Sequence, residues 1–491
     1  HSIQCQYINC EPRMTNKTVK YLSLGVLLGL SQFSQAGQLI QIDSELRQTL
    51  EILKLNGVLN VDISTWPISS EAIQTALSQA QPKSNSDKML LNQVKQKLEA
   101  NDVSKLQIVS NINGDERAVF SGFNTEGNTV TPLGVSISHS HAGDNIDYKI
   151  QGTLNVEDDE PSKSSNLDGS YIGTKLGNHR LAFGSIPVWW GNGVDGSLIR
   201  SDAARPVTGF LMQRANNTPI NFPVLSKLGN FNYQITAGQL QDYKAEPHTK
   251  LIGMRASFQP HEAFQIGASR SLMWGGDNKS ESLKSLGKAL IGKYDNGGED
   301  EDPSNQIAGI DAQLNLKSLM NLPVSVYGEF IGEDEAGGLP SKKAYLAGLK
   351  GTIPLLQQPW LWHAEWANTY YDLDKTNTIY THSIYKDGYY QKGLPLGHPI
   401  GGDGEIISVG LSGHIDANNQ LGLKYANAKV NQSNQVINSA FATKQDLDIV
   451  EADWKHKYND KTSVKLGIWG KKDSISDDKD AGGNLVLEYS Y

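Results

Sequence analysis

The chain has 491 residues, of which 38% are hydrophobic, and a formal net charge of −9. It contains no basic tract, so nucleic acid is not an expected partner. The longest apolar run, near the N-terminus, is shorter than the roughly 20 residues that a membrane-spanning helix needs, which excludes a helical membrane protein.

The first 36 residues contain an export signal. Two lysines follow Met14, and an apolar core and a small-residue cleavage site come next, at residues 21–30 and 34–36. This order is typical of a secretory signal peptide. We therefore predict a signal peptide at residues 14–36 that is cleaved after Ala36.

Residues 1–13 contain no export feature, and His1 cannot be an initiator, so we interpret this segment as translated sequence upstream of the true start. Both cysteines, Cys5 and Cys10, lie in it. The mature chain is therefore expected to have no disulfide and no thiol chemistry.

Between residues 37 and 102 the apolar residues recur at helical spacing in three stretches. The stretches contain Leu46, Leu50 and Leu53, then Ala72, Ile73, Ala76, Leu77 and Ala80, then Leu90, Val94 and Leu98. Gly57, Pro67 and Pro82 separate them. We predict three short amphipathic helices, which form a bundle too small to be stable alone and should dock on another part of the chain.

After Asp102 the period changes from helical to strict alternation and stays so to the end. Between residues 146 and 156, for example, Ile150 and Leu154 alternate with Lys149 and Thr153. A sheet with lipid on one face and water on the other requires this pattern. A soluble β-sandwich also alternates, so the pattern alone does not decide between the two.

Two further features favour a membrane barrel. Short polar turns such as 141–145 alternate with much longer connections such as 274–305, and membrane barrels put short turns in the periplasm and long loops outside. The chain also ends on an alternating strand that finishes with Tyr491. Residues 103–491 therefore predict an all-β transmembrane barrel of roughly 18 antiparallel strands, with the helical bundle of residues 37–102 in the periplasm.

The densest group of candidate binding residues lies in and just after the glycine-rich stretch 184–200. It consists of Trp189, Trp190, Asp195, Arg200 and Arg205. These are residue types of a sugar site, because the apolar face of a sugar packs on an indole while its hydroxyls bond to charged groups. Alternatively, the tryptophans anchor an aromatic belt at the membrane interface and the glycines form turns. The local sequence leaves both interpretations open.

The same stretch resembles a motif of the Wzi family of capsule assembly proteins, Trp-Trp-Gly-x-Gly-x-Asp-Gly-Ser-Leu-Ile, here at residues 189–199. Segments 50–58, 64–67, 272–276 and 396–404 are similar to that family in the same order, so the resemblance covers essentially the mature chain. It implies an outer-membrane barrel with a periplasmic helical bundle and a closed pore. It also implies a surface lectin that helps to attach capsular polysaccharide. The family supplies no ligand residue to transfer, so the five site residues are predictions from local chemistry.

Three other features are candidate sites. The acidic run 299–302 lacks the spaced oxygen ligands of a calcium loop, which favours a solvated surface. Three leucines in residues 283–290 at helical spacing suggest a short lid or plug helix, and simple packing of this helix against the lumen is the favoured alternative. His139 and His141 share one face of a strand, and we interpret them as part of a polar lumen wall rather than as a metal pair.

The sequence contains neither a Gly-x-Ser-x-Gly elbow nor a His-Glu-x-x-His motif. We therefore predict a non-enzyme without cofactor or metal. Its expected partner is capsular or extracellular polysaccharide, which many weak contacts can hold by multivalency. Outer-membrane lipid and the capsule export machinery are further candidate partners. The alternative is a porin or sugar-conducting channel, which would share the strand pattern and the loop asymmetry. An outer-membrane lipid hydrolase would need a Ser–His–acid set, and the sequence offers none.

Overall fold

The computed structural model describes residues 37–112, 122–123, 132–156, 165–291, 304–336, 339–371, 379–434 and 441–491. The predicted upstream segment, the signal peptide and the acidic run 299–302 lie outside these ranges. Within the described ranges, no helix has the length and apolar composition needed to cross a membrane.

The three predicted N-terminal helices are confirmed. They are α2 (Ser44–Leu55), α3 (Ser70–Ser78) and α4 (Asn85–Glu99). The Asp43 carboxylate accepts a hydrogen bond from the backbone N–H of Leu46 at 2.8 Å, which caps the start of α2. Ser84 and Asp87 form a reciprocal capping box at the start of α4. Local sequence therefore fixes where α2 and α4 begin.

From Asp102 onward, the described residues form a closed antiparallel barrel of 18 strands, as predicted. The strands are β4 (Asp102–Ile112), β5 (Leu133–Ala142), β6 (Ile146–Val156), β7 (Ser165–Asn166), β8 (Tyr171–Leu176), β9 (His179–Ser185), β11 (Thr208–Arg214), β12 (Asn230–Gln239), β13 (Lys250–His261), β14 (Phe264–Trp274), β15 (Ser304–Asn315), β16 (Val324–Ala336), β17 (Leu339–Leu355), β18 (Gln358–Tyr371), β21 (Glu405–His414), β22 (Asn419–Val430), β23 (Gln445–Lys457), β24 (Thr462–Asp473) and β25 (Lys479–Ser490). Strands β7 and β8 both pair with β6 and share one place in the wall. The barrel closes where β25 pairs with β4, with Leu487 opposite Ile108.

Smaller elements lie in the connections between the strands and helices. They are β1 (Leu39–Ile40), β2 (Thr65–Trp66), β3 (Ile68–Ser69), β10 (Trp189–Trp190), β19 (Tyr390–Gln391), β20 (Leu394–Pro395), the 3-10 helix η3 (Leu225–Leu228), α5 (Leu283–Leu290) and α6 (Lys317–Met320).

The alternation along the strands separates an apolar outer surface from a polar inner one. On β6, Ile150 and Leu154 are exposed on the outside, whereas Asp147 and Asn155 are buried on the inside. Every backbone polar group of a closed barrel finds its partner on a neighbouring strand, so the wall can lie in hydrocarbon. The alternation therefore arises from a wall with lipid outside and polar groups inside, as the sequence predicted.

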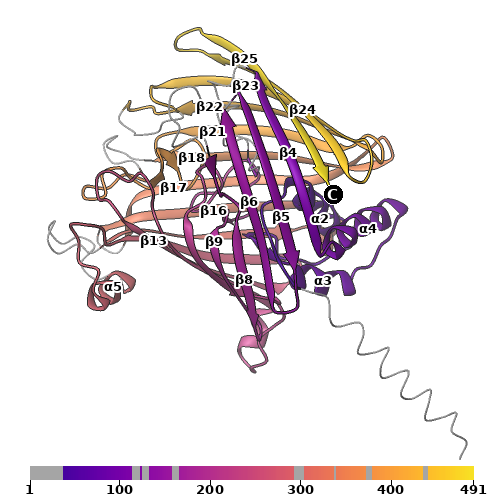
Figure 1. Cartoon of the computed structure of the whole chain (residues 1–491), viewed down its shortest axis with the longest axis horizontal. Helices are drawn as coiled ribbons and strands as arrows, with labels where there is room; N and C mark the ends of the chain where they lie inside the picture. Colours follow the sequence, from indigo (N-terminus) through magenta and orange to yellow (C-terminus); the bar gives the residue numbers. More distant parts are fainter. Residues whose placement is uncertain are drawn as a thin grey trace, which may run out of the picture. The chain divides into compact units, whose positions relative to one another are not determined.

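The helical end of the molecule is also the end of the short turns. Figure 1 shows α2, α3 and α4 gathered at one end of the barrel. The side-chain amide of Asn315, at the end of β15, donates to the carbonyl of Lys54 at 3.2 Å. The backbone N–H of Ala142, at the end of β5, donates to the carbonyl of Asn101 at 2.7 Å. The helices thus dock on the barrel, as their small size required.

The barrel is occupied inside by chain segments that we call the plug, defined as α2 with residues 56–69, and residues 186–206 and 379–404. The ammonium group of Lys54 on α2 donates to the inner-wall Gln265 at 3.1 Å. Two-residue strands β2 and β10 pair inside the lumen, with Trp66 opposite Trp189. A large apolar cluster joins residues 186–199 to residues 379–400 and the inner wall. The lumen is therefore packed by side chains over much of its section.

Candidate functional site

Two glutamates of the inner wall hold the glycine-rich stretch by its backbone. Glu365 on β18 accepts from the N–H groups of Val194 and Asp195 at 2.6 and 3.0 Å. Glu329 on β16 accepts from the N–H groups of Gly193 and Leu198 at 3.3 and 2.9 Å. Because these hydrogen bonds are buried, they fix the path of the motif through the lumen.

Two glycines of the motif are required by close packing. A Cβ atom at Gly191, which has a φ of 132°, would lie 1.9 Å from Oε1 of Glu329. A Cβ atom at Gly196 would lie 2.2 Å from the imidazole of His398. Any larger side chain at these positions would separate the motif from the wall or from the second plug segment. The glycines therefore allow close contact rather than only a turn.

The structure places both tryptophans inside the plug. Trp189 and Trp190 are 0% and 1% exposed. Trp189 makes an edge contact with Phe123, with ring centroids 5.2 Å apart, and the guanidinium of Arg47 lies over its ring. The indole N–H of Trp190 donates to Gln234 at 2.6 Å. Neither the interfacial belt nor an open sugar platform describes these positions, because packed side chains cover both rings. Their contact with polysaccharide stays a prediction.

Asp195 and Arg200 are also buried among plug and wall residues. Asp195 accepts hydrogen bonds from His363 at 2.8 Å and Ser408 at 2.6 Å, and Lys424 lies 3.5 Å away. Burial alone would raise the pKa of Asp195, but the neighbouring Lys424 and His363 hold it below its ordinary value. Asp195 therefore links the plug to strands β18, β21 and β22.

Arg200 is held by apolar and backbone contacts. Its guanidinium lies 5.8 Å from the ring of Trp190. Its backbone carbonyl accepts a hydrogen bond of 2.9 Å from the backbone N–H of Trp190. Among the described residues, no carboxylate forms an ion pair with it. Burial lowers the pKa of this guanidinium. Arg200 is thus buried, where it lines a small pocket of about 20 Å³.

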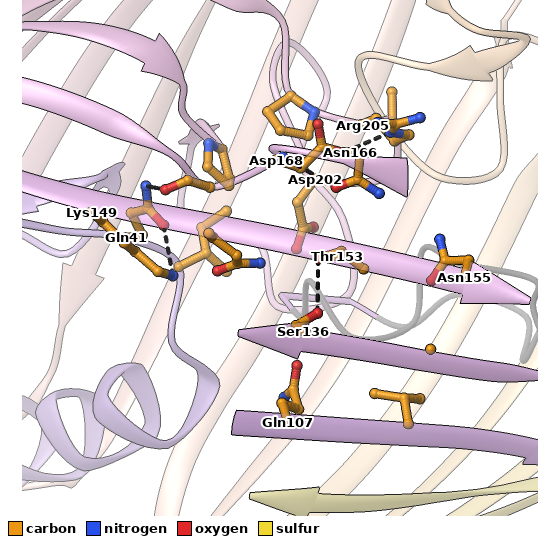
Figure 2. Close-up of a pocket in the computed structure, with 18 residues that line it drawn as sticks. Gln41, Gln107, Ser136, Lys149, Thr153, Asn155, Asn166, Asp168, Asp202 and Arg205 are labelled. Carbon is orange, nitrogen blue, oxygen red and sulfur yellow. Dashed lines mark hydrogen bonds and ion pairs between the residues drawn. The ribbon is translucent and has the colours of Figure 1, made fainter. Parts of the chain in front are cut away.

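Arg205 lines a pocket that is separate from the buried surroundings of the two tryptophans. Its Nε donates to the carboxylate of Asp168 at 2.6 Å, and both side chains keep about a quarter of their surface exposed. The pocket has a volume of about 150 Å³ and lies against the inner faces of β4, β5 and β6. Figure 2 shows Arg205 and Asp168 across the pocket from Ser136 and Gln107 on the strands. Asp195 lines a different pocket of about 250 Å³, beside His363 and Lys424. The structure thus separates Arg205 from the other four members of the predicted site.

The lining of this pocket consists largely of amides, hydroxyls and short apolar groups. The polar members are Gln41, Gln107, Ser136, Lys149, Gln151, Thr153, Asn155, Asn166, Asp168, Asp202 and Arg205. Ser136 and Thr153 share a hydrogen bond of 2.8 Å across β5 and β6, and the ammonium of Lys149 lies 3.3 Å from Oε1 of Gln41. Such groups offer both donors and acceptors to a polyhydroxylated ligand.

Most of these lining residues were not singled out by sequence reasoning. Gln107, Gln151 and Thr153 occupy ordinary inward positions of their strands, and every strand of the wall has such residues. Arg205 and Asp168 come from two connections and lie beside these strands. Their charged side chains distinguish this part of the inner wall from the rest of it. The one sequence feature that pointed to this pocket was the charged Arg205, which lies close to the motif.

Two other predictions about side-chain direction are wrong. His139 and His141 pair with Ile150 and Tyr148 and share their outward face, so they belong to the outer surface rather than the lumen. The imidazole of His141 stacks on Tyr148 with centroids 5.4 Å apart. The predicted lid or plug helix exists as α5, but it packs on the outer face of the wall. Within the described ranges, no group of three or more His, Cys, Asp or Glu side chains is arranged to hold a metal.

Known proteins resemble this chain over most of its length. The family described as capsule assembly protein Wzi matches residues 120–481. A Klebsiella pneumoniae protein, described as an uncharacterized 55.8 kDa protein in the cps region, is 36% identical over 473 residues, which cover 96% of this chain and 93% of that protein.

A solved structure is similar as well. It is that of Wzi from Escherichia coli, described as an outer-membrane protein involved in group 1 capsule assembly and as a carbohydrate-binding β-barrel. It matches with a TM-score of 0.83 and 34% identity, covering 92% of this chain and 98% of that one. Together with the closed 18-strand barrel and its internal plug, these matches show that the chain is an outer-membrane β-barrel that belongs to the Wzi family of capsule assembly proteins.

Proposed function

We propose that this chain binds capsular polysaccharide at the outer face of the outer membrane and helps to attach it to the cell, without catalysing a reaction. The pocket beside Arg205 is the observation that carries this proposal, because it combines a charged pair with many amide and hydroxyl groups. These groups exchange hydrogen bonds with water for hydrogen bonds with sugar hydroxyls at little net cost.

The proposed orientation puts the long connections outside and the helices in the periplasm. It is supported by the position of α2, α3 and α4 at the end of the short turns, since short turns lie in the periplasm in membrane barrels of bacteria.

Retention is the proposed mechanism. A polysaccharide repeats the same unit many times, so one chain can engage many copies of this protein on one cell. Modest affinity at each pocket then suffices to hold the polymer. The packed lumen argues against an open sugar channel as the main activity. Contact with the capsule export machinery stays a prediction from the sequence.

The test is binding of the full mature chain, beginning at Gly37 and held in lipid nanodiscs, to purified capsular polysaccharide from the strain that encodes it. We expect saturable binding that Arg205→Ala weakens about tenfold, since a charge-assisted hydrogen bond contributes ~1.5–3 kcal/mol. The matched control is Lys227→Ala, which removes an exposed charge at the end of the short turns. Absence of binding by the wild-type protein, or equal binding by Arg205→Ala and wild type, would contradict the proposal.

A further inference from the structure

Helix α5 covers part of the outer wall that would otherwise face lipid. Strand alternation points Leu272 and Trp274 of β14 outward, in register with Ile252 and Lys250 of β13. They are nevertheless only 0% and 8% exposed, whereas Ile266, on the same face of β14, is 38% exposed. The difference arises because α5 packs over the end of the strand, where Leu286 and Ala289 contact this pair. Figure 1 shows α5 outside the barrel near β13.

The position of α5 is set by specific polar contacts. The indole N–H of Trp274 donates to the hydroxyl of Ser285 at 3.1 Å. The guanidinium of Arg270, which faces outward on β14, donates to the carbonyls of Leu290 at 2.6 Å and Ala289 at 3.0 Å. A cation at the C-terminus of a helix satisfies its free carbonyls and complements its dipole. The helix is therefore fixed on the wall as a built element.

Beside its wall-facing residues, α5 carries apolar side chains that remain exposed. Leu283 is 88% exposed and Ile291, which follows the helix, is 72% exposed, and Leu290 is exposed between them. We call Leu283, Leu290 and Ile291 the apolar stripe. Lys284 is exposed next to it in sequence. A helix with an apolar stripe beside lysines is typical of elements that lie in a membrane interface.

The height of α5 on the barrel agrees with a position in the membrane interface. Ile266 and Ile310 are exposed on the outer face and mark the apolar band. Phe264 is exposed at the short-turn end of β14, and Leu272 is about 27 Å from it along the strand at the usual rise per residue, which is about 20 Å along the membrane normal for a tilt near 40°. Apolar bands of such barrels are about 25 Å tall. Leu272 and the helix that covers it therefore lie near the upper edge of the band, continuous with the lipid-facing wall.

We propose that α5 is an interfacial anchor that inserts the apolar stripe among the acyl chains of the outer leaflet, while Lys284 binds a lipid phosphate. The outer leaflet follows from the orientation proposed above, because α5 lies in the long connection between β14 and β15. The ligand is a phosphate-bearing lipid at the height of the headgroups. Charge complementarity between Lys284 and phosphate, together with continuity with the lipid-facing wall, supports this occupant.

Fluorescence quenching tests the anchor in the full mature chain. The chain from Gly37 onward contains no cysteine, so Leu283→Cys can carry a single fluorophore. We reconstitute this variant into vesicles that contain lipopolysaccharide and lipids brominated along their acyl chains. The label at residue 283 should be quenched by bromine and protected from aqueous iodide. A label at Lys386→Cys, an exposed plug position, should show the opposite pattern.

The role of the phosphate is tested by charge at residue 284. In the labelled protein, Lys284→Glu should lower bromine quenching about twofold in lipopolysaccharide vesicles, and Lys284→Arg should preserve it, because only the first change repels phosphate. Dephosphorylated lipopolysaccharide should abolish the difference between the two variants. If the label at residue 283 is accessible to iodide and is not quenched by bromine, α5 points into water and the proposal is wrong. Polysaccharide binding by Leu283→Cys is expected to match wild type, so this failure would be distinct from failure of the proposed function.

Discussion

The ammonium group of Lys350, on the inner wall, lies 2.5 Å from Oε1 of Glu51 on helix α2. Both side chains are buried, and Lys350 also donates to the carbonyl of Asn192 in the motif at 3.2 Å. One wall residue thus joins the N-terminal helix to the glycine-rich stretch. The plug is held to the barrel by such buried polar contacts as well as by apolar packing.

Removing one partner of this pair should destabilise the protein strongly. Glu51→Gln leaves the Lys350 charge buried without its carboxylate, at a cost of about 3 kcal/mol. The double variant Glu51→Gln/Lys350→Met should recover part of the loss. Urea unfolding in micelles measures both. The control is Lys97→Gln, which breaks the surface ion pair with Asp43 and should cost less than about 1 kcal/mol. A loss for Glu51→Gln no larger than that of the control would contradict the prediction.

The two wall glutamates should decide whether the lumen conducts ions. Glu329→Ala/Glu365→Ala removes the acceptors of four buried backbone N–H groups, each worth about 1–3 kcal/mol when left unsatisfied. We expect the wild-type mature chain to be silent in planar bilayers and the double variant to show stable conductance. Glu405→Ala is the control, since that glutamate accepts from the indole of Trp366 and not from the plug. A folded double variant that stays silent would show that other contacts hold the plug.

Trp189 and Arg205 should have opposite effects on stability and binding. Trp189→Ala leaves a cavity in the plug and should cost about 3–5 kcal/mol of unfolding free energy. The polysaccharide affinity of the folded variant should equal that of wild type, because Trp189 does not line the pocket. Arg205→Ala should lower affinity while changing stability little. Calorimetric binding and urea unfolding on the same samples test this contrast. Loss of affinity by a stably folded Trp189→Ala would instead place the indole in contact with sugar.

His398 should make the plug sensitive to acid. Burial lowers the pKa of His398 to about 3, and its Nδ1 accepts from the backbone N–H of Ile400 at 3.3 Å. In the unfolded chain the imidazole titrates near pH 6.5, so the unfolded state binds the proton more readily below that pH. The stability contributed by neutral His398 is full above about pH 6.5 and is lost as the pH falls toward 3, at about 1.4 kcal/mol per pH unit.

The matched variant for this pH dependence is His398→Asn, which keeps an acceptor for Ile400 and has no titrating group. Between pH 6.5 and pH 5, wild type should lose about 2 kcal/mol more unfolding free energy than the variant does. Urea unfolding at several pH values measures the difference. Parallel curves for the two proteins would show that His398 titrates normally in the folded state.

The barrel could be predicted from sequence because its determinants are local. Alternation of Ile150 with Lys149 and Gln151 depends only on which face of a strand meets lipid, and the turn lengths are visible directly. The helix caps at Asp43 and Ser84 are equally local. Each of these features is decided within a few residues, so a single sequence suffices.

The site was predicted only in part because burial in the plug depends on distant partners. Trp189 is covered by Trp66, Phe123 and Arg47, which come from other connections, so its own neighbourhood in sequence gives no sign of burial. The leucine spacing correctly predicted helix α5. It could not decide which side of the wall the helix covers, which the outward residues Arg270 and Trp274 determine.

The seam between β25 and β4 also constrains the order of assembly. Leu487 near the end of the chain faces Ile108 near the start of the barrel, so the sheet cannot become a cylinder until its last strand is in place. The ammonium of Lys455 on β23, close to that seam, lies 2.9 Å from the Glu45 carboxylate on α2. Strand β23, near the end of the chain, thus contacts α2, the first described helix. Closure of the wall therefore brings the two ends of the described chain together, and the last strands and the first described helix hold each other in the folded state.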